Sequence, residues 1–280
     1  MSSRVYFAPA KVNLALDVLG TRQDGYHELD GVMASLDWGD TLAFSPGKDV
    51  QVTFCGMEAP RENTVTRAVV AYQKAAGKPR AGAHIQVIKR TPHEAGLGGG
   101  SADGAAAIRA MEDAYGPLPA QIREEVACSV GADVPFCLAG GLCRSQGIGE
   151  RLTALPACPV ELWLLLVKPR QGISTAALFG GLEETGLVHP DVPAVMAALQ
   201  AGDLAWLGQA MGNALEGPGE RLLPVLGRIK SQLLEAGALG AVMTGSGSTM
   251  VGLFPGREQA LAARHGFGEY PFVQVARAGA

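Results

Sequence analysis

The sequence predicts an α+β protein with two lobes. Short strand-like segments dominate its first half, and the second half is rich in helices but still contains strands. Between the halves, residues 153–160 read Thr-Ala-Leu-Pro-Ala-Cys-Pro-Val, and the two prolines favour a domain boundary there. We therefore expect an N-terminal domain over residues 1–153 and a C-terminal domain over residues 154–280.

Alternation of apolar and polar residues predicts the strands of the first half. These strands cover residues 12–19, 29–36, 41–44, 50–54 and 84–89. Asp24-Gly25 predicts a tight turn between the first two strands. Helices are predicted over residues 64–76, 101–115 and 119–130. Asn63 can cap the first of them, whereas Gly77 and Gly131 can end the first and the third.

The second half is predicted to open on a buried strand over residues 162–167. Four helices follow, at residues 176–182, 191–200, 203–211 and 221–236. Residues 240–243 and 250–254 flank a Gly-Ser turn and predict a hairpin. A helix over residues 257–265 and a strand over residues 272–276 close the chain.

The composition is typical of a well-packed globular protein. Of the 280 residues, 48% are apolar and 18% are charged, which excludes a disordered chain. The formal charge of −4 argues against a nucleic-acid-binding surface. The chain shows no signal-peptide pattern, and its longest aliphatic run, residues 162–167, is too short to span a membrane. We expect a cytoplasmic protein with no nucleic-acid or membrane partner, as a monomer or a weak homodimer.

The most informative segment is a glycine-rich loop that joins a predicted strand to an alanine-rich helix. Five of the nine residues over 96–104 are glycines, which removes the side chains that would keep a polyphosphate from the backbone. The start of the helix offers unpaired N–H groups to an anion, so we expect a nucleoside triphosphate there. The alternative is a tight turn before a packed helix. The Walker and dinucleotide motifs are both absent, because Ser101 stands where they require a lysine or a glycine.

Three segments, taken in order, resemble the motifs of the GHMP kinase superfamily. They are Pro-Ala-Lys-Val-Asn-Leu at residues 9–14, Pro-x-x-x-Gly-Leu-Gly-Gly-Gly-Ser at 92–101 and Gly-Ser-Gly-Ser at 245–248. The resemblance implies a two-lobed GHMP kinase fold. Its N-terminal domain would be a ribosomal-protein-S5-like α/β domain, and its C-terminal domain a ferredoxin-like α+β domain.

Two further segments, residues 22–28 and 130–136, narrow the resemblance. They are similar to segments in those GHMP kinases that phosphorylate a cytidine diphosphate-linked methylerythritol in the non-mevalonate isoprenoid pathway. The resemblance implies transfer of the ATP γ-phosphate to the 2-hydroxyl of this small molecule, with ATP and Mg²⁺ as cofactors. Asp133 would be the general base. Lys11 would orient Asp133 and the attacking oxygen, or neutralise charge in the transition state. The alternatives are an Asx-turn for Asp133 and a solvated charge for Lys11.

The resemblance also implies the residues that bind the two substrates. The ATP-binding residues would be Pro92, His93, Glu94, Ala95, Gly96, Leu97, Gly98, Gly99, Gly100, Ser101 and Ala102. The residues that bind the second substrate would be Asn13, Tyr26, His27, Ile148, Phe179, Gly245 and Ser246. An aromatic ring and an imidazole suit the flat face and polar edge of cytosine. The alternative for Tyr26 and His27 is a turn with an exposed aromatic residue, and for Ile148 and Phe179 it is a position in the apolar core. Asn13 could instead be a polar residue that faces solvent, and Gly245 and Ser246 could belong to an ordinary hairpin turn.

No metal-binding group of side chains is visible in the sequence. The five cysteines lack C-x-x-C spacing, which argues against a zinc site and a disulfide framework. Mg²⁺ binds with few protein ligands and keeps water and phosphate oxygens as ligands, so the lack of such a group in the sequence is expected.

The glycine loop departs from the pattern of its relatives at four positions. Ala102 and Gly104 replace a serine and an alanine, so one hydroxyl that could contact phosphate or metal is lost. His93-Glu94 replaces small residues, and the carboxylate could repel phosphate or face solvent. Tyr26-His27 and residues 130–136 argue against two rival functions, another small-molecule GHMP kinase and a related diphosphomevalonate decarboxylase. The presence of both Lys11 and Asp133 argues against a third, a non-catalytic nucleotide-sensing module.

Overall fold

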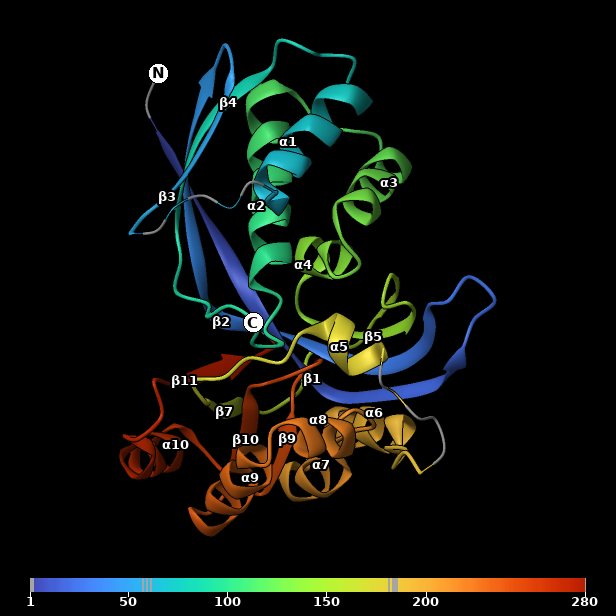
Figure 1. Ribbon diagram of the computed structural model, residues 1–280, viewed down its shortest axis with the longest axis vertical. Helices are drawn as coiled ribbons and strands as arrows, with labels where there is room; N and C mark the ends of the chain where they lie inside the picture. The colour runs from blue at the N-terminus through green and yellow to red at the C-terminus, as the bar shows by residue number, and fades with distance from the viewer. Residues whose placement is uncertain are drawn as a thin grey trace. The chain divides into compact units, whose positions relative to one another are not determined.

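The computed structural model describes residues 3–56, 58, 60, 62–180, 182 and 186–279 (Figure 1). These residues form two compact units that interleave along the chain. The described residues of 1–10, 38–91 and 98–139 make the first unit, and those of 11–37, 92–97 and 140–280 make the second. The predicted boundary between residues 153 and 154 divides the chain only once, and it stays a prediction.

Strands β1 (Arg4–Thr21) and β2 (His27–Gly47) contribute residues to both units. Strand β2 is continuous where two strands were expected, because residues 37–40 keep the extended backbone of their neighbours. A Cβ on Gly39 would lie 2.1 Å from the carbonyl oxygen of Ala8. Gly39 is therefore present for the close approach of β1, although in the sequence it resembles a break between two strands.

The sheet of the first unit contains strands of both directions. Strand β3 (Val50–Phe54) lies parallel to β4 (Gly82–Ile88), and β4 pairs antiparallel with Thr41–Gly47 of β2. The buried residues of β4 alternate with exposed ones, as expected for a strand with one face on the core. This confirms the strands predicted over residues 50–54 and 84–89.

Four helices belong to the first unit: α1 (Thr64–Ala75), α2 (Gly99–Tyr115), α3 (Ala120–Val130) and α4 (Val134–Ala139). The predicted cap of α1 is confirmed, since the Asn63 side chain accepts a hydrogen bond from the Thr66 N–H. Helix α4 was not predicted. Its first residues, Val134, Pro135 and Phe136, are buried in a helix rather than lying in a loop.

Small residues allow α2 to pack closely against its neighbours. Ala102 is fully buried, so the side chain at this position lies in the packing of the helix and not on its open face. A Cβ on Gly104 would lie 3.1 Å from Cγ1 of Val130 and 3.4 Å from Cβ of Thr64. Gly104 therefore lets α2 approach α1 and α3, which gives a packing reason for one of the four departures noted in the glycine loop.

A buried cluster of charges joins α2 to the sheet of the first unit. The Lys89 ammonium contacts Asp40 and donates to Oδ2 of Asp103 at 2.8 Å. Asp40 is fully buried and also accepts from the N–H groups of Arg90 and Thr91, at 2.5 and 2.7 Å. Burial raises the pKa of Asp103 to about 7; the Lys89 charge opposes this shift and the Asp40 charge adds to it.

The second unit contains a four-stranded antiparallel sheet. Its strands are β7 (Leu162–Lys168), β9 (Gly240–Met243), β10 (Met250–Phe254) and β11 (Phe272–Ala278), in the spatial order β11-β7-β10-β9. Helices lie in the chain between β7 and β9 and between β10 and β11. This β-α-β-β-α-β succession is ferredoxin-like and confirms both the predicted hairpin and the predicted fold class.

The helices of the second unit differ from expectation mainly near Pro224. They are α5 (Thr175–Gly180), α6 (Val192–Ala201), α7 (Leu204–Ala210), α8 (Glu216–Leu222), α9 (Val225–Glu235) and α10 (Arg257–Arg264), with a 3₁₀ turn at His265–Phe267. The helix predicted over residues 221–236 is divided in two, because Pro224 starts α9. Residue 181 of the predicted helix 176–182 lies outside the described residues. None of the described helices is long and apolar enough to cross a membrane.

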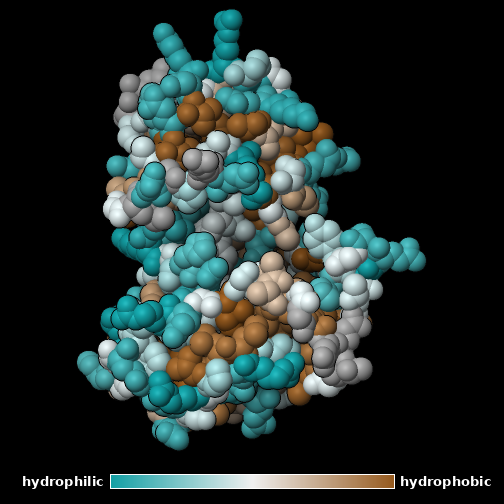
Figure 2. All heavy atoms as spheres, in the orientation of Figure 1, coloured by the Kyte–Doolittle hydropathy of each residue, from teal (hydrophilic) through white to brown (hydrophobic). Residues whose placement is uncertain are grey.

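Three short strands complete the second unit. Strand β8 (Gly212–Asn213) pairs parallel with β1, and β5 (Leu142–Gly147) pairs antiparallel with β2 and with β6 (Arg151–Ala154). None of the three was predicted, because they are short, the buried residues of β5 and β8 include polar or glycine positions, and β6 has no buried residue. In each unit, hydrophilic side chains cover much of the face shown in Figure 2, with apolar residues visible between them.

We expect Asp103→Asn to alter how stability depends on pH. The folded-state pKa of Asp103, about 7, lies above its ordinary value of 3.8. Between about pH 4 and about pH 7, the folded protein therefore holds a proton on Asp103 that the unfolded chain has released. The contribution of Asp103 to the free energy of unfolding falls as pH rises through this range, and it stays level at higher pH. One proton corresponds to at most about 1.4 kcal/mol per pH unit. Urea unfolding across this pH range measures the difference between wild type and variant.

The matched control is Asp113→Asn, which changes an exposed carboxyl on the same helix. Its stability curve should run parallel to that of the wild type. Parallel curves for Asp103→Asn as well would show that Asp103 is ionised in the folded protein throughout this pH range.

Candidate active site

The glycine loop reaches the first unit at the start of α2. Gly98 has a left-handed backbone (φ +65°), and its carbonyl accepts the Ala102 N–H at 2.9 Å. A Cβ on Gly99 would lie 2.7 Å from Cγ2 of Thr91, so this position has no room for a side chain. Gly100 is exposed and Ser101 is half-buried. The first turn of α2 thus offers main-chain N–H groups and the positive end of the helix dipole, and Gly98, Gly99 and Gly100 carry no side chains there.

Asp133 lies in the turn between α3 and α4. It is half-buried, and its carbonyl accepts the Cys137 N–H at 3.0 Å. A Cβ on Gly131 would lie 3.7 Å from Oγ of Ser101. The turn that carries Asp133 therefore lies beside the start of α2.

In the second unit, Lys11 and Asn13 lie on β1 and point to the same side of the strand. Both are buried, with 5% and 4% of their surface exposed, and Nζ of Lys11 donates to Oδ1 of Asn13 at 2.7 Å. The Lys11 N–H donates to the carbonyl of Leu97 at 2.9 Å. The lysine predicted from the first motif is thus bonded through its backbone to the segment 92–97 of the glycine loop.

Thr244 connects the first motif with the glycine loop. Its fully buried hydroxyl accepts the Asn13 N–H at 2.9 Å and donates to the Gly96 carbonyl at 3.3 Å. Gly96 has φ +70°, and a Cβ there would lie 2.0 Å from the carbonyl oxygen of Thr244. Only glycine fits at position 96, both for its backbone conformation and for this contact. The N–H groups of Ser248 and Thr249 reach the same segment, at the carbonyls of Glu94 and Ala95.

The Gly-Ser turn of the third motif therefore lies against the glycine segment and the lysine. A Cβ on Gly245 would lie 3.3 Å from Nζ of Lys11. Asn213 supports this turn from β8, because its side-chain amide donates to the carbonyls of Met243 and Gly245, at 2.7 and 2.8 Å. No motif or pattern in the sequence indicated Asn213. Thr244 directly precedes the Gly-Ser motif, and this position was its only signal.

The Glu94 side chain lies against a neighbouring loop. It is exposed, with φ +47°, and a Cβ on Gly172 would lie 2.4 Å from its Oε2. Burial lowers the pKa of Lys168, and the Glu94 charge opposes this shift. Nζ of Lys168 donates to the carbonyls of Pro169 and Gln171, at 3.2 and 3.4 Å. The carboxylate thus lies against the loop that follows β7, beside a buried cation.

The remaining residues of the glycine segment vary in exposure. Ala95 and Leu97 are buried, with 3% and 1% of their surface exposed. Pro92 is half-buried and His93 is exposed. Only part of the predicted segment therefore presents side chains to solvent.

The residues predicted to contact cytosine include a stacked pair. The rings of His27 and Phe179 are 4.9 Å apart between centroids, with 29° between their planes. Tyr26 is 60% exposed, so its ring is open to solvent. Thr175, at the start of the helix that carries Phe179, shares a hydrogen bond with Ser246 at 2.7 Å between hydroxyl oxygens. The helix α5 is thereby tied to the Gly-Ser turn.

Ile148 lies at a different turn, between β5 and β6, and is half-buried. Its N–H donates to Oε2 of Glu150 at 2.7 Å. Among the described residues, no group of three or more His, Cys, Asp or Glu side chains could hold a metal ion.

Comparisons with known proteins identify the family of this chain. The family model described as the GHMP kinases N terminal domain matches residues 63–141, and the GHMP kinases C terminal model matches residues 195–271. The 4-diphosphocytidyl-2-C-methyl-D-erythritol kinase of Pelotomaculum thermopropionicum is 45% identical over 268 residues, which cover 92% of each chain.

Solved structures show the same relationship. A crystal structure of 4-(cytidine 5'-diphospho)-2C-methyl-D-erythritol kinase is 34% identical, with a TM-score of 0.85, and covers 99% of this chain and 100% of its own. Homoserine kinase from Cytophaga hutchinsonii, at 21% identity and a TM-score of 0.75 over 100% of this chain and 95% of its own, shares the fold alone. The chain belongs to the 4-diphosphocytidyl-2-C-methyl-D-erythritol kinase family of the GHMP kinases.

Proposed function

We propose that this kinase transfers the γ-phosphate of ATP to the 2-hydroxyl of 4-diphosphocytidyl-2-C-methyl-D-erythritol. One observation carries the proposal: three motifs distant in sequence meet in the second unit, where Lys11, Gly96 and Thr244 are joined through hydrogen bonds or close approach. A purely nucleotide-binding module would have no need for a buried lysine beside the glycine segment. The family relationship supports the choice of substrate.

The first turn of α2 would hold the ATP phosphates. Its main-chain N–H groups, from Gly98 to Ser101, lie at the positive end of a helix of 17 residues. Gly100 is exposed and has no side chain, which leaves room for the phosphates to approach the backbone there. When bound, Mg²⁺ neutralises charge on the phosphates, and it needs few ligands from the protein.

Asp133 would take the proton of the attacking alcohol. A bond forms between the 2-hydroxyl oxygen and the γ-phosphorus, the bond from that phosphorus to the β-phosphate oxygen breaks, and ADP leaves. The hydroxyl proton passes to the Asp133 carboxylate. Lys11 would orient the reacting oxygen or neutralise charge in the transition state. Its ammonium is held in place by Oδ1 of Asn13.

The cytidine end of the substrate would bind at Tyr26, His27, Ile148 and Phe179. The His27–Phe179 stack offers a preformed aromatic surface, and Tyr26 adds a ring that is open to solvent. Gly245, Ser246 and Asn13 would contact the polar middle of the substrate. Mg²⁺, a cytoplasmic location, and a monomer or weak homodimer stay predictions.

A substrate panel tests the proposed function. With ATP, we expect ADP to form with the cytidine diphosphate-linked methylerythritol and not with mevalonate or homoserine, because only the first has a base for the aromatic pair. A coupled ADP assay on the purified protein measures this. ADP formation with mevalonate or homoserine alone would identify another GHMP kinase, and ATP binding without turnover on any of the three would indicate a nucleotide-sensing module.

We expect Asp133→Asn and Lys11→Ala each to lower kcat by at least ~100-fold while the fold survives, since general-base catalysis typically contributes ~10²–10⁴-fold. Steady-state kinetics give kcat, and circular dichroism checks the fold. Glu124→Gln and Lys48→Ala, which change exposed residues, are the controls and should keep the wild-type rate. An Asp133→Asn enzyme with near wild-type kcat would remove Asp133 from the role of base.

We expect Phe179→Leu to raise KM for the cytidine-linked substrate and to leave KM for ATP unchanged. Loss of an aromatic stack costs about 0.5–1.5 kcal/mol, which corresponds to roughly 2- to 12-fold. The kinetic constants for each substrate, measured with the other at saturation, separate the two effects. Trp206→Leu changes an exposed aromatic residue of the same unit and is the control. Equal changes in both KM values would place Phe179 outside cytidine recognition.

A further inference from the structure

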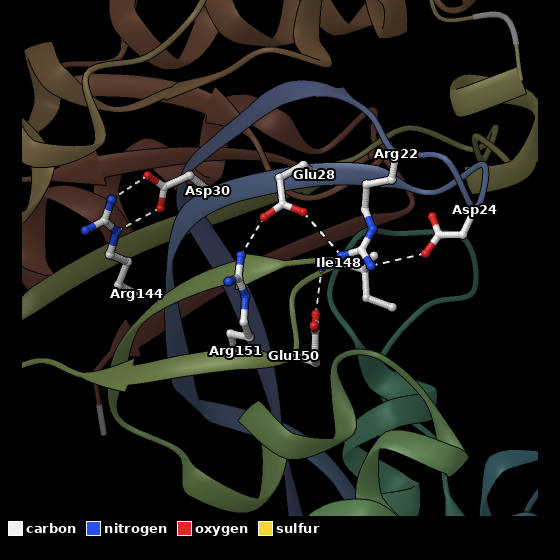
Figure 3. A network of polar contacts seen from close by, with 8 residues as sticks. All are labelled: Arg22, Asp24, Glu28, Asp30, Arg144, Ile148, Glu150 and Arg151. Atoms are coloured by element: carbon white, nitrogen blue, oxygen red, sulfur yellow. Dashed lines mark hydrogen bonds and ion pairs between the residues drawn. The ribbon is translucent and has the colours of Figure 1, made fainter.

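A network of ion pairs surrounds the turn between β1 and β2, and the proposed reaction does not use it (Figure 3). Arg22 contacts Oδ2 of Asp24 at 3.1 Å and Oε2 of Glu28 at 3.3 Å. The other carboxylate oxygen of Glu28 accepts from Arg151. Glu28 therefore bridges two arginines that are 129 positions apart in the sequence, Arg22 and Arg151 (151 − 22).

The same turn is closed by hydrogen bonds of its backbone. The Arg22 N–H donates to the Tyr26 carbonyl at 2.7 Å, and the Gly25 N–H donates to the Arg22 carbonyl at 3.0 Å. The Tyr26 N–H donates to Oδ1 of Asp24 at 3.1 Å. Arg22 thus contributes both its backbone and its side chain to the turn that presents Tyr26.

Arg151 connects this turn to a second one. It is the first residue of β6, directly after the turn that carries Ile148. Glu150 folds back over that turn, since its carboxylate accepts the Ile148 N–H and a Cβ on Gly147 would lie 2.6 Å from it. Gly147 has φ +75°, so the turn depends on glycine for its backbone as well as for space. The contact between Glu28 and Arg151 therefore joins the Tyr26 turn to the Ile148 turn.

The exposure of these residues argues against a role in stability. The side chains of Arg22, Glu28 and Arg151 are 41%, 31% and 62% exposed. Exposed ion pairs contribute little to stability. Asp30 of β2 and Arg144 of β5 provide a contrast, because their bidentate pair has distances of 2.7 and 2.8 Å and the Asp30 side chain is only 12% exposed.

We propose that Glu28, held between Arg22 and Arg151, is a positioning residue that fixes the Tyr26–His27 turn relative to the Ile148 turn for recognition of a cytidine nucleotide. This inference rests on the proposed function, in which both turns contact the base. Restricting the two turns before binding lowers the entropy that is lost when the base binds. None of the three ionic side chains needs to touch the substrate for this effect.

Glu28→Gln and Arg151→Gln test the proposal in steady-state kinetics. We expect each to raise KM for the cytidine-linked substrate about fivefold, equivalent to about 1 kcal/mol, with kcat and KM for ATP unchanged. Because both changes break the contact between Glu28 and Arg151, the double variant should be no worse than Glu28→Gln alone. Arg151→Lys keeps the charge and should restore at least half of the lost affinity. Titration calorimetry with cytidine 5'-diphosphate should show the same pattern without turnover.

The matched control is Arg144→Gln, which should lower the thermal midpoint of unfolding and leave KM for the cytidine-linked substrate unchanged. The proposal is overturned if folded Glu28→Gln and Arg151→Gln keep the wild-type KM, if both KM values rise equally, or if the two effects multiply in the double variant. A wild-type enzyme that neither phosphorylates the cytidine-linked substrate nor binds cytidine diphosphate would instead overturn the proposed function, which the unmodified protein reveals first.

Discussion

The arrangement of the second unit depends on one fully buried hydroxyl, that of Thr244. It joins the backbone of Asn13 on the first motif to the backbone of Gly96 in the glycine loop. The contact is possible because position 96 has no side chain, since a Cβ would meet the Thr244 carbonyl at 2.0 Å. With this junction closed, Gly245 lies so near Lys11 that a Cβ on it would be 3.3 Å from Nζ of the lysine. Three segments that are distant in sequence are thereby held together.

The buried and the exposed charged side chains differ in what they contribute to stability. Lys89, Asp40 and Asp103 lie within the first unit, where low dielectric makes each unpaired charge costly and the cluster must stay together. One oxygen of Asp103 nevertheless has no hydrogen-bond partner among the described residues, which agrees with a carboxyl that binds a proton near neutral pH. By contrast, the ion pairs of Arg22 and Arg151 are hydrated, so their contribution to stability is small.

Local sequence patterns predicted the helices and strands that depend on residues close together in the sequence. The Asn63 cap, the alternation of β4 and the β9–β10 hairpin were all visible in the sequence, because each depends on residues a few positions apart. Strand β2 was predicted as two pieces, since Gly39 resembles a break until Ala8 of β1 is seen against it. Strands β5, β6 and β8 lack a clear alternation and exist because partners distant in sequence pair with them.

The same distinction explains which residues of the candidate site were foreseen. Motifs identify residues whose type the proposed chemistry requires, such as Lys11 and Asp133, and they locate glycines. They do not identify a residue such as Asn213, whose amide matters only because the carbonyls of Met243 and Gly245 lie in front of it. The part of the site proposed to bind phosphate uses main-chain groups, which have fixed directions and do not titrate, whereas the turns proposed to bind the base depend on side chains. Only the second kind of group can be identified from residue type alone, and the first has to be located through its glycines.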